Sequence, residues 1–113
     1  MQFVQDSEWY KVVRITGPAH NLLGLSFSNE TDCQIDVLPL PVKAGQMKQI
    51  SAEEVRLHVL AGLTEANQSL GTQYRIGKIQ FVPTDTPPTD IYRVLARSIV
   101  ERLAHKQTFS QVK

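Results

Sequence analysis

The sequence contains a single cysteine, no long apolar run and almost no net charge. Its 113 residues include 12 Lys and Arg against 11 Asp and Glu, which leaves a net charge of +1. The lone cysteine, Cys33, excludes a disulfide or a cysteine-based zinc site within one chain. No segment approaches the roughly 18 consecutive apolar residues that a membrane span requires, and the first residues carry no secretory signal pattern. We therefore expect a reduced, cytoplasmic protein without a membrane partner.

The rest of the composition is that of an ordinary globular domain, with 42% apolar, 20% charged and 7% aromatic residues. This profile excludes the collagen, coiled-coil and low-complexity classes. Because 113 residues is the usual size of one domain, we expect a single domain over residues 1–113. Poor order is expected at its two ends, about residues 1–7 and 106–113.

Alternating apolar and polar residues predict an antiparallel pair of strands over residues 9–16 and 22–28. The intervening residues 17–21 have the length of a hairpin connection. A third strand is predicted over residues 34–38, and Pro39 and Pro41 favour an edge position because proline cannot donate to a sheet.

A fourth strand is predicted over residues 74–82, where the apolar alternation changes parity. Tyr74 and Ile76 share one face, whereas Ile79 and Phe81 follow at an odd spacing. Gly77, at the change of parity, predicts a β-bulge that restores the apolar side.

The clearest local signal is a capping box at residues 51–54, which predicts the start of a helix. The Ser51 hydroxyl can accept from the Glu54 amide while the Glu54 side chain reaches back. Gly71 is placed to end this helix, and Gly62 beside its apolar stripe predicts close approach to a sheet. The stripe consists of Val55, Val59, Leu63, Ala66 and Leu70.

A second helix is predicted after a turn at residues 83–88, with Thr86 or Thr89 as its N-cap. The order β-β-β-α-β-α predicts an α+β, two-layer sandwich with a mainly antiparallel sheet and both helices on one face. This order is similar to that of the small domains typified by the fourth domain of elongation factor G, and the likeness extends to element order alone.

Four residues are candidates for a site: His20 and Asn21 in the predicted hairpin loop, and Asp85 and Asp90 before the last helix. If the two loops meet, an imidazole beside a carboxylate can serve in acid–base catalysis or bind a cation. A separation beyond about 10 Å would exclude direct proton transfer between His20 and Asp85. The alternative is an exposed loop histidine and carboxylates that cap a helix.

The other chemistry-bearing residues give weaker signals. His58 lies one helical turn after Glu54, but two ligands do not make a metal site, so we predict neither a metal nor a cofactor. Arg93 and Arg97 lie four residues apart on the second helix, where they could contact phosphates. The alternative is a solvated helix face with internal ion pairs, because no aromatic residues alternate with these arginines.

The sequence lacks the phosphate-loop, dinucleotide, serine-hydrolase and zinc-protease motifs, which argues against the common catalytic classes. Cys33 lies near Asp32 and Asp36, whose charges disfavour a reactive thiolate.

A two-layer sandwich leaves one sheet face uncovered, and the strand at residues 9–16 carries apolar groups on both faces. Leu57, Leu60 and Ala61 also lie outside the main stripe of the first helix. This surplus predicts a homodimer or a protein partner. Our leading hypothesis is therefore a small, non-catalytic cytoplasmic binding or protein-interaction domain that self-associates. Two alternatives stay open: a small enzyme or ligand-binding protein that uses the loops of His20 and Asp85, and a nucleic-acid-associated domain that uses the basic second helix.

Overall fold

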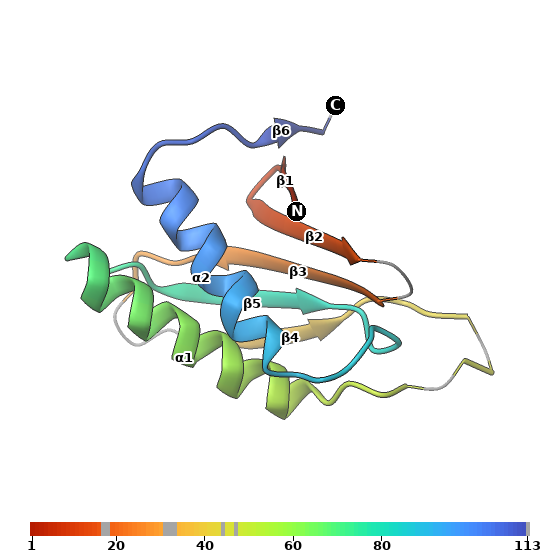
Figure 1. The fold of residues 1–113 in the computed structure, drawn as a ribbon. Coiled ribbons are helices and arrows are strands. Elements are labelled where there is room, and N and C mark those ends of the chain that lie inside the picture. Colours follow the sequence, from red (N-terminus) through yellow and green to blue (C-terminus); the bar gives the residue numbers. More distant parts are fainter. Residues whose placement is uncertain (17–18, 31–33, 44, 47, 113) are drawn as a thin grey trace.

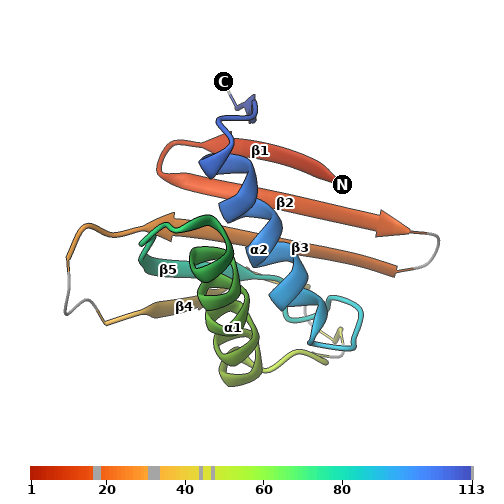
Figure 2. The same ribbon diagram turned by 60° about the vertical axis from the view of Figure 1, so that its left-hand side comes forward.

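The computed structural model describes residues 1–16, 19–30, 34–43, 45–46 and 48–112. These residues form six strands and two helices, and both helices cover the same face of one sheet (Figures 1 and 2). The elements are β1 (Gln2–Asp6), β2 (Trp9–Thr16), β3 (Ala19–Phe27), β4 (Asp36–Pro39), α1 (Ala52–Leu70), β5 (Ile76–Phe81), α2 (Ile91–Ala104) and β6 (Ser110–Gln111). The predicted α+β class, with two helices on one face of a sheet, is confirmed.

The strand order in the sheet is β4-β5-β3-β2-β1-β6. The pairs β1–β2, β2–β3 and β3–β5 are antiparallel, whereas β4–β5 and β1–β6 are parallel. The sheet is therefore mainly antiparallel, as predicted. Strand β4 ends at Pro39 and lies at one edge, where a residue without an amide hydrogen is tolerated.

The predicted hairpin is present, but β3 begins at Ala19 and is longer than the sequence pattern indicated. Ile15 pairs with His20 and Arg14 pairs with Asn21 in the register of the two strands. The prediction that His20 and Asn21 lie in a loop is therefore wrong, because pairing with β2 extends the strand to them. The predicted break at residues 17–18 lies outside the described residues, as do Asp32 and Cys33.

The β-bulge predicted in β5 is confirmed. Ser26 pairs with Lys78, whereas Phe27 pairs with Ile76, so Gly77 is the extra residue. This insertion keeps the apolar side chains of β5 on the side covered by the helices. Ile76, Ile79 and Phe81 are all buried.

Strands β1 and β6 lie in the two end segments for which the sequence analysis expected poor order. Both strands make long-range contacts within the fold. The rings of Phe3 and Phe109 pack edge to face with centroids 5.9 Å apart, and Phe109 is only 6% exposed. The guanidinium of Arg102 lies 4.4 Å from the centroid of the Phe3 ring.

Helix α1 begins and ends where the sequence predicted. The Ser51 hydroxyl accepts a hydrogen bond from the Glu54 amide at 3.2 Å, and Gly71 takes the left-handed conformation with φ 68°. The prediction that the Glu54 side chain reaches back to Ser51 is wrong. The Glu54 carboxylate accepts from the hydroxyl of Thr89 at 2.9 Å and thereby links the beginnings of the two helices.

Gly62 marks the close approach of α1 to α2, rather than to the sheet as we expected. A Cβ atom at this position would collide with the backbone carbonyl of Arg93 and would lie 3.2 Å from its Cα. Because Gly62 has no side chain, the two helices can pack this close to each other.

The N-cap position of α2 is Asp90, and its side chain makes no capping hydrogen bond. The prediction that Thr86 or Thr89 caps this helix is therefore wrong. Both hydroxyls instead bind distant segments: Thr89 donates to Glu54, and Thr86 accepts from the amide of His20 at 3.2 Å.

Candidate functional site

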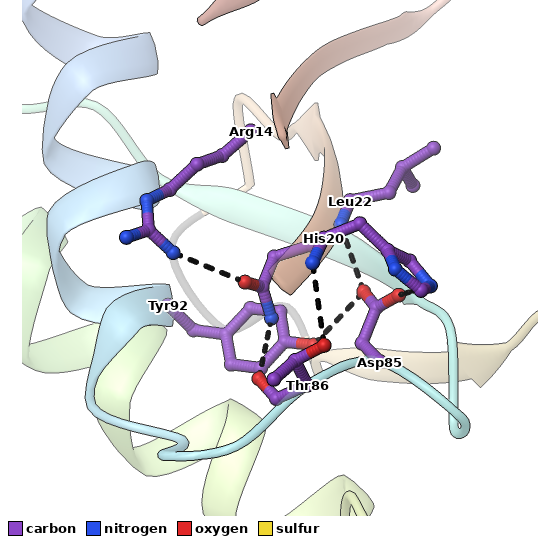
Figure 3. Close-up of polar contacts among 7 residues, drawn as sticks. Arg14, His20, Leu22, Asp85, Thr86 and Tyr92 are labelled. Carbon is purple, nitrogen blue, oxygen red and sulfur yellow. Dashed lines mark hydrogen bonds and ion pairs between the residues drawn. The ribbon is translucent and has the colours of Figure 1, made fainter. Parts of the chain in front are cut away.

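The structure brings His20 and Asp85 together at one end of the sheet, where their Nε2 and Oδ1 atoms are 3.9 Å apart (Figure 3). His20 lies at the start of β3, and Asp85 follows the end of the antiparallel neighbour β5. The side chain of His20 is 59% exposed, whereas that of Asp85 is 2% exposed. The separation is far below the 10 Å limit that would have excluded the pair, but it is too long for a direct hydrogen bond.

The second oxygen of the Asp85 carboxylate is held by two donors from different elements. Oδ2 accepts from the backbone amide of Leu22 at 2.8 Å and from the Tyr92 hydroxyl at 3.1 Å (Figure 3). Asp85 therefore ties β3 to α2.

Burial governs the protonation of both buried groups. It raises the pKa of Asp85 above its usual value, although the hydrogen bonds from Leu22 and Tyr92 and the charge of His20 act in the opposite direction. Burial and the negative charge of Asp85 also raise the pKa of the Tyr92 phenol. Tyr92 consequently stays protonated and serves as a hydrogen-bond donor to the carboxylate.

Asn21 faces the helices and anchors the loop that carries Asp85. Its side chain is buried, donates to the carbonyl of Thr86 at 2.8 Å and accepts from Arg14 at 3.4 Å. Thr86 also donates its amide to the carbonyl of His20 at 3.2 Å. These bonds fix the position of Asp85 relative to His20.

Asp90 does not join the other three candidates. It is exposed at the start of α2, and within the described residues its side chain forms no hydrogen bond to His20, Asn21 or Asp85. The candidate site therefore includes Asp85 but not Asp90.

Arg93 and Arg97 are engaged in ion pairs on the outer surface of the helical layer. Arg93 lies 2.9 Å from Glu65, and Arg97 lies 3.5 Å from Glu65 and 2.8 Å from Glu101. These carboxylates neutralise part of the basic row.

The sheet face opposite the helices has two ends of different character. We call Val13, Ile15, His20 and Leu22 the apolar end. We call Asp6, Glu8, Lys11, Ser26 and Lys78 the polar end, where the half-buried Trp9 lies on the same face as Lys11. At the apolar end, Val13 pairs with Leu22 across the strands, and Ile15 is 69% exposed.

The polar end is closed by interactions within the chain. Glu8 accepts from Ser26 at 3.3 Å and pairs with Lys78 at 3.3 Å, and Lys11 pairs with Asp6 at 3.6 Å. Both lysines of this face thus already have an anionic partner.

Several features that would extend the site do not occur in the described part of the chain. No group of three or more His, Cys, Asp or Glu side chains is placed to hold a metal ion there. The hollows beside Tyr74, beside Pro83 and beside Val13 contain neither His20 nor Asp85. Neither described helix combines the length and the apolar character that a membrane crossing requires.

Three partners of the site were not predicted from the sequence: Arg14 beside Asn21, Thr86 beside His20, and Tyr92 beside Asp85. Tyr92 stood out only as a residue beside the apolar stripe of α2. No local pattern connects it with Asp85, because the strand order decides which loops meet.

Comparison with known proteins gives no match for this chain among family models, curated proteins or solved structures.

Proposed function

We propose that this chain is a non-catalytic cytoplasmic protein-interaction domain that binds a second copy of itself through the apolar end of the uncovered sheet face. The observation that carries the proposal is the 69% exposure of Ile15 beside the Val13–Leu22 pair, on the face that no helix covers. Isolated exposed apolar residues are ordinary, but a cluster at a sheet face is typical of an interface. The single cysteine suits a reducing compartment.

The charges on this face favour a second copy over a strongly charged partner. Lys11 and Lys78 both pair with carboxylates of their own chain. An acidic partner would have to break these pairs. An apolar patch, in contrast, is complementary to itself around a two-fold axis, which is the commonest symmetry of homo-oligomers.

A second candidate function is acid–base chemistry or ligand binding at His20 and Asp85, and the 3.9 Å separation of their side chains favours it. However, Asp85 already accepts hydrogen bonds from Leu22 and Tyr92, and the hollows beside Tyr74 and beside Pro83 do not include either residue of the pair. These contacts support a role in holding the fold more than a role in turnover. The third possibility, nucleic-acid binding by α2, is weakened by the ion pairs of Arg93 and Arg97.

The proposal is tested by measuring the mass of the protein in solution. Light scattering at micromolar concentration should give about twice the 12.7 kDa mass of the chain. Ile15→Glu should return the mass to that of a monomer, because it places a charge in the apolar contact.

Leu57→Glu is the matched control, since Leu57 is 56% exposed but lies on the helical layer. This variant should remain dimeric. A wild-type protein that stays monomeric at high concentration would overturn the proposal, as would a dimer that only Leu57→Glu disrupts.

A further inference from the structure

We propose that two copies of this chain interlock, with Ile15 of each copy seated in a hollow beside Val13 on the other. The inference rests on the proposed self-association and specifies which side chains meet across it. The hollow has a volume of about 210 Å³ and is lined by Met1, Gln2, Val13 and Ile15. Gln2 pairs with Val13 in the sheet register, so the hollow lies at the apolar end of the uncovered face.

The hollow lies at a step in the sheet. Strand β1 begins at Gln2, opposite Val13, whereas β2 continues through Ile15 to Thr16. Ile15 therefore lies beyond the last residue pair of β1 and β2, and its pairing partner is His20 of β3. A projecting side chain and a hollow are thus neighbours on one surface.

The exposure and the size of these two features match. Ile15 is 69% exposed, so its side chain can enter a second molecule while the sheet beneath it keeps its register. A cavity of about 150 Å³ engineered into another protein holds a benzene molecule. A hollow of about 210 Å³ therefore has room for the branched side chain of an isoleucine.

The surface itself specifies a second copy as the occupant. The side chains that line the hollow carry no charge, and Lys11 on the same face is already paired with Asp6 of its own chain. An apolar group is therefore the favoured occupant. A two-fold contact uses the same patch on both molecules, so an axis beside Ile15 seats both isoleucines at once.

The experiment fills the hollow and measures the dissociation constant of the dimer by analytical ultracentrifugation. Val13→Phe adds apolar surface to this face but takes up the space for Ile15 of the other copy, so the dimer should weaken by about tenfold or more. Ile15→Ala should weaken it by about 10- to 100-fold, because the buried apolar area is lost. The double variant should dimerise more tightly than Val13→Phe alone, since removal of the isoleucine side chain relieves the collision.

Leu38→Ala is the matched control, because Leu38 is 42% exposed on the edge strand β4 and does not line the hollow. Its dissociation constant should equal that of the wild type. Circular dichroism should show the same fold for all four variants.

The outcomes separate this inference from the proposed function. A dimer that Val13→Phe strengthens or leaves unchanged overturns the interlocking contact, and the self-association still stands. Additive losses in the double variant, or an equal loss with Leu38→Ala, also overturn the contact. A wild-type protein that stays monomeric at high concentration overturns both proposals.

Discussion

The two ends of the uncovered sheet face differ in how their side chains are satisfied. At the polar end, Glu8 contacts both Ser26 and Lys78, so the charged groups find partners within one chain. At the apolar end, the Ile15 side chain is exposed, whereas the backbone amide of Leu22 is held by its hydrogen bond to Asp85. A rigid backbone that carries an exposed apolar surface favours binding, because little conformational entropy is lost when a partner binds. The difference indicates which end a partner would use.

We expect the largest loss of stability from a substitution of Asp85, which holds the backbone of Leu22 at the apolar end. Asp85→Ala leaves the part-buried amide of Leu22 and the buried hydroxyl of Tyr92 without this acceptor. We expect the free energy of unfolding to fall by about 2–4 kcal/mol, measured by urea denaturation. A loss below about 1 kcal/mol would mean that the junction between β3 and α2 does not depend on this carboxylate.

The pH dependence of stability is a second test of the role of the Asp85 carboxylate. The pKa of Asp85 is raised in the folded protein, so between the unfolded value of 3.8 and the folded value the native state binds more protons than the unfolded state. Stability from this group is therefore greatest at low pH and falls as the pH rises through that window. The difference in unfolding free energy between the wild type and Asp85→Asn should fall over the same range. A difference that rises with pH would show that hydrogen bonding outweighs burial at this carboxylate.

The smallest expected effect is at the polar end. Glu8→Ala removes the partner of Lys78 and Ser26, but the Glu8 side chain is 57% exposed and its ion pair is screened by water. We expect a loss of about 0–1 kcal/mol that shrinks further in high salt. A loss as large as that of Asp85→Ala would contradict the distinction between the two ends.

Features fixed by neighbouring residues were predictable from the sequence. The Ser51 cap joins two residues three positions apart, Gly71 ends the same helix, and the parity change around Gly77 identifies the bulge. Each depends on local geometry, which a short pattern records directly. The sheet class followed because alternation and helix periodicity together restrict the possible layers.

The candidate site was predictable only as a set of residues. The hydrogen bond between Leu22 and Asp85 joins positions 63 residues apart, and nothing in either segment indicates the other. Placing β5 beside β3 creates the contact, and this order was not fixed by local patterning. Strand β1 was missed for the same reason, since the Phe109 ring that packs against Phe3 comes from the opposite end of the chain.

The edges of the sheet limit how another chain can bind to it. Strand β4 ends at Pro39, and the two-residue strand β6 covers Val4 and Gln5 of β1, so both edges of the sheet offer little continuous backbone to an added strand. The contact that we propose would therefore use side chains on a face, without backbone pairing or the swapping of strands. A contact of this kind would form and dissociate between intact folded molecules, and single substitutions would change its lifetime without disturbing the sheet.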